Sequence, residues 1–404
     1  MGDLARWRGW AEVDLAAIRH NAAVLARAAT PARLCAVVKA NGYGHGAVPV
    51  ARAALAGGAQ WLAVALVEEG AELREAGIGA PVLLLAEPPA PDMHEALALG
   101  LTPTLYTTGG VQAAARAARL RGSPAAVHVK VDTGMHRVGA DADVAVDLAA
   151  AVQASPWLTL GGFWTHLAVA DEPDNDFTAQ QVRRFEAALA RLKVLKVEPS
   201  LVHAANSAGA LAHPAARYGL VRCGIAVYGH APSPELAGLP AVGELRPALA
   251  LKARVTLARE LDAGEGVSYG LAYRLARRST VATVPLGYAD GVTRRLWARG
   301  GEVLIGGRRC PVAGTVTMDQ LMVDCGTGAS VAPGDEVVLI GTQGGEEIAA
   351  AEWAARLETV TYEVLCGIGP RVPRVHVGEM EEVAGEHASA VTAPSPGRSG
   401  PFDR

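Results

Sequence analysis

The sequence is poor in aromatic residues and has no excess of charge of either sign. Aromatic residues make up 5% of the 404 positions, with only four phenylalanines, although half of the chain is hydrophobic. The 37 basic and 41 acidic residues are interspersed and give a net charge of -4. This pattern excludes the basic patch expected of a nucleic-acid-binding protein. It is typical of a soluble enzyme with room for two domains.

Cysteine is scarce, and no long apolar run occurs. The five cysteines are odd in number, scattered and never spaced as C-x-x-C, which argues against disulfides and zinc clusters, so no metal is predicted. They are Cys35, Cys223, Cys310, Cys325 and Cys366. Charged residues occur already within positions 1–6, and no apolar run approaches the length of a membrane span. We therefore expect a cytoplasmic protein that does not engage a membrane.

Short apolar runs alternate with helical stretches through the first half of the chain. Eight runs lie at 34–38, 61–66, 81–86, 101–106, 125–131, 158–166, 200–205 and 219–223. Asp14 is suited to cap a helix over 15–29, and Asp176 to start a helix from Phe177 to Leu192. Eight strands with helices between them predict an α/β fold, a TIM-like (β/α)8 barrel.

The pattern changes after the turn-rich passage that begins at Pro232. Short β-rich segments punctuated by glycine follow, at 248–257, 279–285, 303–305, 321–325 and 336–340. We therefore predict a barrel domain over residues 1–240 and a C-terminal, mainly-β domain over 241–384. The Ser/Pro/Gly/Ala-rich segment 385–404 is expected to be disordered.

Lys39 is the most informative single residue. It ends the apolar run 34–38 and precedes the glycine-rich segment Ala40-Asn41-Gly42-Tyr43-Gly44-His45-Gly46-Ala47. A buried ammonium is costly, so a lysine at this point needs a reason. A partly desolvated lysine loses its proton easily and can attack the aldehyde of pyridoxal phosphate. The alternative is a structural lysine whose ammonium reaches solvent at the strand end.

The same segment also fits a dinucleotide-binding fingerprint. Gly42-x-Gly44-x-x-Ala47 lies between a strand and a helix, and Glu68 and Glu69 follow at the spacing of a ribose-binding acid. A doubly wound fold of that kind needs fewer strands, so the count of eight favours the barrel.

Polar residues follow several of the other predicted strands. Lys130 lies in the run 125–131 and Arg137 follows it, while His166 ends the run 158–166. His203 lies in the run 200–205, Ser207 follows it, and Arg222 lies in the run 219–223. Each alone could be structural, but a barrel gathers its strand ends at one mouth. There the Ser207 hydroxyl and nearby backbone N–H groups could hold a phosphate, and Arg222 could hydrogen-bond a pyridine nitrogen and keep it unprotonated.

At this point the sequence resembles the bacterial alanine racemases, which are pyridoxal-phosphate-dependent enzymes of fold-type III. The resemblance runs from about Glu12 to Val375 in both predicted domains. It is carried by Ala36-Val37-Val38-Lys39-Ala40-Asn41-Gly42-Tyr43-Gly44-His45-Gly46, Asp132-Thr133-Gly134-Met135-x-Arg137, Asn206-Ser207, Val221-Arg222-x-Gly224-Ile225, Val267-Ser268-Tyr269-Gly270, Gly287-Tyr288-Ala289-Asp290-Gly291, Met318-Asp319-Gln320 and Tyr362-Glu363-Val364-Leu365-Cys366.

The resemblance implies two catalytic bases on opposite faces of the substrate. Lys39 would carry the cofactor as a Schiff base and act as one base, and Tyr269 would be the other. Arg222 would face the pyridine nitrogen, and His166 would link it to Tyr269 and bring the pKa of the tyrosine closer to working pH. The implied reaction interconverts L-alanine and D-alanine and supplies D-alanine for peptidoglycan synthesis.

Binding roles follow from the same motifs. Arg137 and Met318 would meet the substrate carboxylate, and Tyr288 would narrow the entrance in favour of alanine, although serine would fit almost as well. The implied cofactor contacts, mainly to the phosphate, are Tyr43, Asn206, Ser207, Gly224, Ile225 and Tyr362. The chain departs mildly from the family at His136 and at Gly314-Thr315-Val316-Thr317.

Two further features are implied. Lys130 would be carbamylated and pair with Arg137, the alternative being a plain salt bridge to Asp132. The protein would be a homodimer with shared active sites, in which the second domain of one chain covers the barrel mouth of the other.

Two other functions remain to be weighed. A non-catalytic pyridoxal-phosphate carrier would lack the second domain and the counterparts of Tyr269 and Met318. A decarboxylase of the same fold would carry a cysteine-bearing motif and a glycine-rich phosphate loop, which this sequence does not show.

Overall fold

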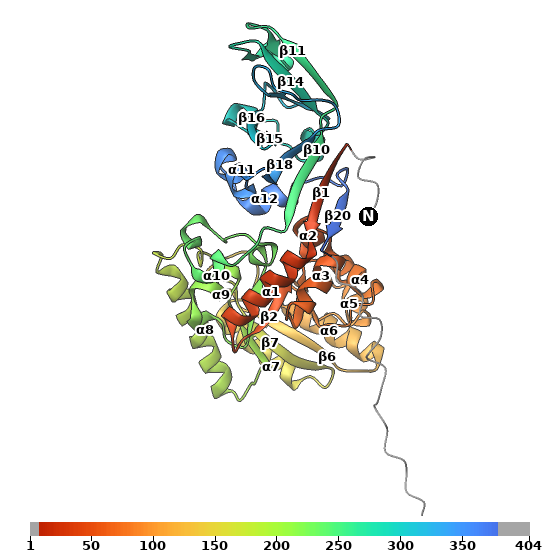
Figure 1. Ribbon diagram of the computed structural model, residues 1–404. Helices are drawn as coiled ribbons and strands as arrows, with labels where there is room; N and C mark the ends of the chain where they lie inside the picture. The colour runs from red at the N-terminus through yellow and green to blue at the C-terminus, as the bar shows by residue number, and fades with distance from the viewer. Residues whose placement is uncertain (1–7, 379–404) are drawn as a thin grey trace, which may run out of the picture.

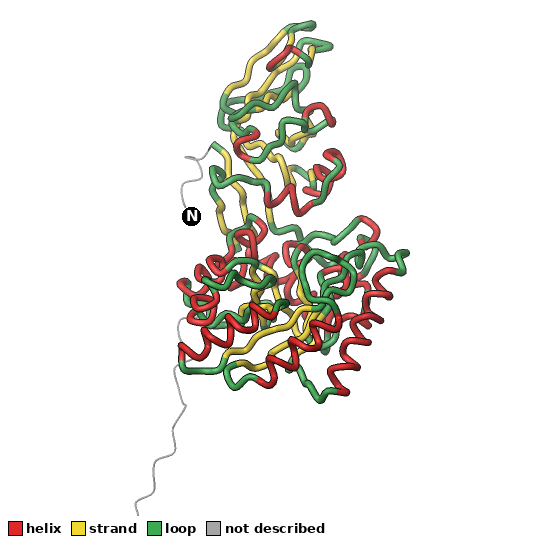
Figure 2. Tube along the Cα trace, turned by 180° about the vertical axis from the view of Figure 1, so that it is seen from behind, coloured by secondary structure: helices red, strands yellow, loops and turns green. Residues whose placement is uncertain are grey.

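The computed structural model describes residues 8–378, so the segment 385–404 lies outside the described residues. Two lobes follow one another (Figure 1), and the lower lobe contains a ring of strands surrounded by helices (Figure 2). None of the helices in residues 8–378 is long and apolar enough to cross a membrane.

The lower lobe is a parallel barrel. Its eight strands are ordered β4-β3-β2-β9-β8-β7-β6-β5, and an isolated parallel bridge between Leu83 and Thr102 nearly closes the ring. The strands are β2 (Arg33–Val37), β3 (Trp61–Val64), β4 (Val82–Leu84), β5 (Thr104–Leu105), β6 (Ala125–Lys130), β7 (Leu158–Trp164), β8 (Leu201–His203) and β9 (Leu220–Cys223). Each lies within or beside one of the eight apolar runs, so the predicted TIM-like fold is confirmed.

Helices cover the outside of this barrel. The first begins as predicted, because the Asp14 carboxylate accepts a hydrogen bond from Ala17 N at 3.1 Å. The helices are α1 (Leu15–Ala29), α3 (Ala47–Ala56), α4 (Val67–Glu75), α5 (Met93–Ala98), α6 (Thr108–Arg121), α7 (Ala142–Ala154), α8 (Phe177–Val194), α9 (Ser207–Ala212) and α10 (Pro240–Gly243). The short segment α2 (Lys39–Tyr43) lies at the barrel mouth and is not regular helix. The predicted helix from Phe177 therefore forms and extends to Val194.

The upper lobe is mainly β, as predicted. Its largest sheet is ordered β16-β15-β18-β10-β1-β20, with β19 paired to β18, and a three-stranded and a two-stranded sheet lie beyond it. The strands are β1 (Gly9–Asp14), β10 (Leu249–Arg254), β11 (Leu257–Leu261), β12 (Gly266–Val267), β13 (Tyr273–Arg274), β14 (Ser279–Val284), β15 (Glu302–Ile305), β16 (Arg308–Pro311), β17 (Leu321–Asp324), β18 (Glu336–Gln343), β19 (Glu346–Ile348) and β20 (Arg374–Val377). Its helices are α11 (Ala350–Leu357) and α12 (Thr361–Cys366).

Strand β1 joins the two lobes. It precedes the barrel in the chain, yet it pairs antiparallel with β10 and parallel with β20 in the upper sheet. The described chain therefore starts in the second domain, forms the barrel and returns to the second domain. This arrangement brings α12 and β20 against the barrel mouth.

Candidate active site

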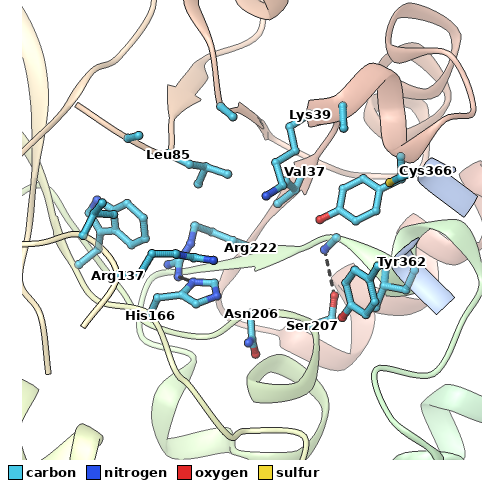
Figure 3. Close-up of a pocket in the computed structure, with 18 of the residues that line it drawn as sticks. Val37, Lys39, Leu85, Arg137, His166, Asn206, Ser207, Arg222, Tyr362 and Cys366 are labelled. Carbon is cyan, nitrogen blue, oxygen red and sulfur yellow. Dashed lines mark hydrogen bonds between the residues drawn. The ribbon is translucent and has the colours of Figure 1, made fainter. Parts of the chain in front are cut away.

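A pocket of about 630 Å³ opens at the carboxyl ends of the barrel strands. Lys39 follows β2, Lys130 ends β6, His166 follows β7, and Arg222 lies in β9, while α12 contributes from the second domain. Figure 3 shows the side chains of Lys39, Arg137, His166 and Arg222 converging on this space. The pocket is lined by Lys39, Tyr43, Lys130, Arg137, His166, Asn206, Ser207, Arg222, Gly224, Ile225 and Tyr362, among others. The structure thus brings most of the predicted site residues together.

The segment after Lys39 has an unusual backbone. Ala40, Asn41, Gly42 and Tyr43 all adopt left-handed φ angles of 51–59°, a conformation that costs energy for residues other than glycine. It is held by two side-chain contacts: Glu69 Oε1 accepts from Ala40 N at 2.6 Å, and Asn41 Oδ1 accepts from Ala47 N at 2.9 Å.

Glu69 therefore anchors the lysine segment. Its other oxygen, Oε2, accepts from Ala65 N at 2.8 Å, so both oxygens are engaged by the backbone of their own chain. The sheet is a barrel and has no crevice of the doubly wound kind. The dinucleotide interpretation of Gly42-x-Gly44-x-x-Ala47 is wrong.

Lys39 is half-buried and lies among other cations. Burial, followed by the positive charge of Arg137, lowers the pKa of the Lys39 ammonium. A lowered pKa raises the fraction of neutral amine, which is the nucleophilic and basic form.

Arg222 is the centre of a buried hydrogen-bond network. Its Nη1 donates to His203 Nδ1 at 2.7 Å, and its Nη2 contacts His166 Nδ1 at 3.1 Å and the carbonyl oxygens of Thr165 and Ala204 at 2.9 Å. The guanidinium also stacks on Trp164, 4.3 Å from the ring centre. Arg222 Nε is buried and has no partner among the described residues. The Nε–H of Arg222 is therefore a donor that the described residues leave without an acceptor.

A turn built around Ser207 and Gly224 forms another part of the pocket wall. Ser207 Oγ accepts from Gly224 N at 2.9 Å, so the Ser207 hydroxyl proton is free to be donated. Gly224 leaves room for Tyr43, because a Cβ there would lie 2.4 Å from the Tyr43 hydroxyl oxygen and the tyrosine would have to move. Tyr362 approaches Tyr43 with ring centres 6.1 Å apart. Asn206 caps α9 by accepting from Gly209 N at 2.9 Å, which fixes the strand-to-helix turn beside Ser207.

Lys130 is buried without an anionic partner. Its Nζ lies 4.4 Å from the centre of the Trp164 ring, and the described residues form no salt bridge with it. Burial, followed by the charges of Arg222 and Arg137, lowers the pKa of Lys130 to about 7. Asp132 instead accepts from Gly134 N and from both the backbone N and Nδ1 of His136. The alternative of a Lys130–Asp132 salt bridge is not formed.

Three predicted site residues lie outside this pocket. Tyr269, Tyr288 and Met318 belong to the second domain, and 71%, 41% and 52% of their surfaces are exposed. Their segments are tied together, since Tyr288 N donates to Thr317 O at 3.0 Å and Thr315 Oγ1 to Tyr269 O at 3.4 Å. The three side chains therefore form an exposed group that their own chain's pocket does not use.

The comparisons with known proteins agree with this geometry. The profile of the alanine racemase N-terminal domain matches residues 13–232, and that of the alanine racemase C-terminal domain matches residues 248–376. The chain belongs to the alanine racemase family. It is therefore an enzyme, an amino-acid racemase, as predicted.

Individual relatives match over nearly the whole chain. Alanine racemase of Symbiobacterium thermophilum is 51% identical over 92% of this chain and 97% of its own length. The structure of alanine racemase from Streptomyces coelicolor A3(2) superposes with a TM-score of 0.87 at 41% identity and covers 93% of this chain and 99% of its own. The structure of alanine racemase from Bacillus anthracis with bound L-Ala-P gives a TM-score of 0.85 at 39% identity, covering 92% and 96%.

Sequence reasoning gave no role to several residues of the site. Trp164 stacks under both Arg222 and Lys130, and Cys366 lines the pocket beside Tyr362. Trp164 lies in an apolar run and directly precedes the predicted strand-end pair Thr165-His166. This position could have predicted that Trp164 lies near the barrel mouth. His203 was noted only as a strand-end residue, and its contact with Arg222 depends on the pairing of β8 with β9.

Proposed function

We propose that this protein interconverts L-alanine and D-alanine with pyridoxal 5'-phosphate and two bases, Lys39 of one subunit and Tyr269 of another. The observation that carries the proposal is that Lys39, Arg222 and the Ser207–Gly224 turn line one cavity, while the Nε of Arg222 has no hydrogen-bond partner among the described residues. The proposal is further supported by relatives that bear the name alanine racemase.

The residues present fit pyridoxal phosphate. Lys39 is an amine placed to attach its aldehyde, Arg222 Nε is a donor for its pyridine nitrogen, and the hydroxyls of Ser207, Tyr43 and Tyr362 are donors for its phosphate. When bound, the cofactor accepts the electron pair left behind by the Cα proton. Because Arg222 can only donate, it keeps the pyridine nitrogen unprotonated and weakens this electron sink. We infer that the weaker sink limits protonation at the wrong carbon, and hence transamination.

Racemisation requires a base on each face of the substrate. The lowered pKa of Lys39 suits it to take or return the Cα proton on its own face. Tyr269 does not line the pocket of its own chain and is exposed on the second domain. A homodimer in which each second domain covers the other barrel supplies Tyr269 to the open face.

His166 would couple this tyrosine to Arg222. Its Nδ1 accepts from Arg222 Nη2, so its proton lies on Nε2 and can be donated to a phenolate. Burial and the charge of Arg222 lower the pKa of His166 well below the usual value, which keeps the ring neutral. A neutral donor beside Tyr269 stabilises the phenolate, which is the base.

Substrate recognition would use both subunits. Arg137 at the pocket wall suits the carboxylate of alanine, with Met318 of the other subunit beside it and Tyr288 at the entrance. A small pocket favours alanine and admits serine. The product D-alanine would serve peptidoglycan synthesis.

Lys130 would be carbamylated in the working enzyme. The lone pair of its neutral amine would attack carbon dioxide at carbon and form an N–C bond, while one C=O π bond breaks and its electron pair goes to the oxygen. The nitrogen would then release one proton to solvent, which leaves an anionic carbamate. The carbamate would place a negative charge near Arg222 and Arg137, the cations that lower the pKa of Lys130. It would hold the Arg137 guanidinium for the substrate carboxylate.

A direct assay tests the proposal. The purified protein is loaded with pyridoxal phosphate and incubated separately with L-alanine and D-alanine, and both enantiomers are followed by chiral chromatography. Each enantiomer is expected to give the same final mixture. Cofactor binding without racemisation would instead support the non-catalytic carrier, and release of carbon dioxide would support the decarboxylase.

A further inference from the structure

A chain of buried side chains leads from Arg222 into the centre of the barrel. Arg222 Nη1 lies 2.7 Å from His203 Nδ1, and His203 Nε2 lies 3.0 Å from His128 Nδ1. Both imidazoles are fully buried, at 0% exposure. The function proposed above uses Arg222 and leaves His128 without a role.

The direction of every hydrogen bond in this chain is set by Arg222. A guanidinium donates and cannot accept, so His203 Nδ1 carries no proton and His203 Nε2 carries it. His203 Nε2 then donates to His128 Nδ1, which leaves the His128 proton on Nε2. Burial, followed by the charge of Arg222, lowers the pKa of His128 to about 3 and that of His203 well below its usual value, so both rings are neutral.

The barrel is shaped to hold the His128 ring. Opposite it, the register between β6 and β7 passes from Val127↔Leu160 to His128↔Gly162, so Gly161 forms a bulge. A Cβ at Gly162 would lie 2.6 Å from His128 Nδ1, and one at Gly161 would lie 3.2 Å from the ring. Gly162 gives the imidazole its space, and a side chain at Gly161 would crowd it. The bulge and the two glycines therefore aim His128 at His203.

A buried histidine at this place has a cost. His128 Nε2 is buried with no partner among the described residues. An apolar side chain of similar size would avoid this unpaired atom, but it would leave the buried His203 Nε2–H without its acceptor. What an apolar residue lacks is the acceptor Nδ1.

We propose that His128 is a positioning residue for Arg222. By accepting from His203 Nε2, it holds the His203 ring in the position from which Nδ1 accepts from Arg222, and this fixes the guanidinium in one orientation at the pocket wall. The identity of the group that Arg222 then meets rests on the proposed function.

The tautomers are measured directly by NMR on protein with ¹⁵N-labelled histidine. Long-range ¹H–¹⁵N correlations show which ring nitrogen carries the proton, and the His203 signals are assigned from their loss in His203→Gln. Both His203 and His128 are expected to carry the proton on Nε2. A proton on His203 Nδ1 would overturn the proposal, whether or not the protein proves to be a racemase.

Substitutions test the consequence in the cofactor-loaded protein. His128→Leu removes the acceptor and is expected to lower kcat for alanine about tenfold, the scale of one lost hydrogen bond, with a shifted visible band of the bound cofactor. His128→Asn keeps an amide oxygen near the place of Nδ1 and is expected to restore most of the activity and the band.

Val127→Ala is the matched control, since it disturbs the neighbouring buried residue of β6 without touching the hydrogen-bonded chain. It is expected to keep the native kcat and band. Equal losses in His128→Leu and Val127→Ala, or no rescue by His128→Asn, would overturn the proposal. If His128→Leu does not fold, the NMR measurement of the tautomers and the activity of His128→Asn still test the role of His128. If the native protein itself does not racemise alanine, the proposed function fails. The NMR result then tests the proposal for His128 independently of that function.

Discussion

Arg374 on β20 donates from Nε to the carbonyl oxygen of Gly44 at 2.8 Å, across 330 positions of sequence. The same guanidinium also binds the carbonyl oxygens of Gly369 and Val372 in the second domain. It therefore ties the segment that follows Lys39 to the second domain of its own chain. A Cβ at Gly44 would lie 2.7 Å from Leu365 O, so this close approach requires glycine.

Replacing Gly44 by alanine is expected to destabilise the protein and to disturb the lysine segment. Gly44 has φ +82°, which costs about 1–2 kcal/mol for alanine, and the contact with Leu365 O adds to that. Gly77→Ala is the control, because Gly77 has φ +77° but nothing within 4 Å of its Cβ position. Urea unfolding should show a larger loss of free energy of unfolding for Gly44→Ala than for Gly77→Ala. Cofactor binding should be weaker in Gly44→Ala only. Equal losses would show that the contact with α12 is unimportant.

Lys39 is expected to carry the cofactor. In Lys39→Ala the visible absorbance of the covalently attached cofactor and nearly all racemisation should be lost, whereas Lys193→Ala, an exposed lysine of α8, should keep both. Borohydride reduction followed by digestion and mass spectrometry should place the pyridoxyl group on Lys39. A label on any other lysine contradicts the assignment.

Lys130 should take up carbon dioxide reversibly. Protein equilibrated with ¹³C-bicarbonate at neutral pH is expected to give a carbamate ¹³C signal that Lys130→Met lacks. Lys130→Met should also lose activity, because Arg137 loses its anionic partner. An unmodified Lys130 amine in the fully active enzyme would contradict this proposal.

The same lysine predicts a pH dependence of stability in carbon dioxide-free buffer. The pKa of Lys130 is about 7 in the folded protein and 10.5 ordinarily, so between these values the unfolded chain binds more protons. The contribution of Lys130 to stability therefore rises with pH across this window, and below about pH 7 the buried charge has its full cost. Urea unfolding should show that Lys130→Met has a higher free energy of unfolding than the native protein at low pH. This difference should shrink toward pH 10. A gain that does not vary with pH would contradict the lowered pKa.

The active site is expected to be complete only between two subunits. Mixing Lys39→Ala with Tyr269→Phe subunits would put both defects into one site of a heterodimer and leave the other site intact, so activity should exceed that of either parent. Tyr269→Phe should also slow the two substrate directions unequally under proton-exchange conditions, because it removes the base from one face only. Demonstrated heterodimers without such activity would place Tyr269 in its own chain's site.

The local sequence pattern was enough to predict the barrel and most of its mouth. Apolar runs such as 34–38 and 219–223 become strands because their residues are buried on both faces. A parallel barrel must present the ends of those strands on one side, so Lys39, His166 and Arg222 meet once the strands are counted correctly.

What the sequence pattern did not predict are the contacts made across the fold. Gly9–Asp14 has no local feature that assigns it to the upper sheet, and only its pairing with β10 and β20 does so. Asp132 lies two residues from Lys130, yet a local turn directs its carboxylate to His136. The exposure of Tyr269, Tyr288 and Met318 likewise follows from where the second domain packs. Strand patterns and capping residues act over a few positions and are visible in the sequence. Hydrogen bonds such as those from Arg222 to His203 and from Arg374 to Gly44 depend on which surfaces meet, and only the tertiary structure decides that.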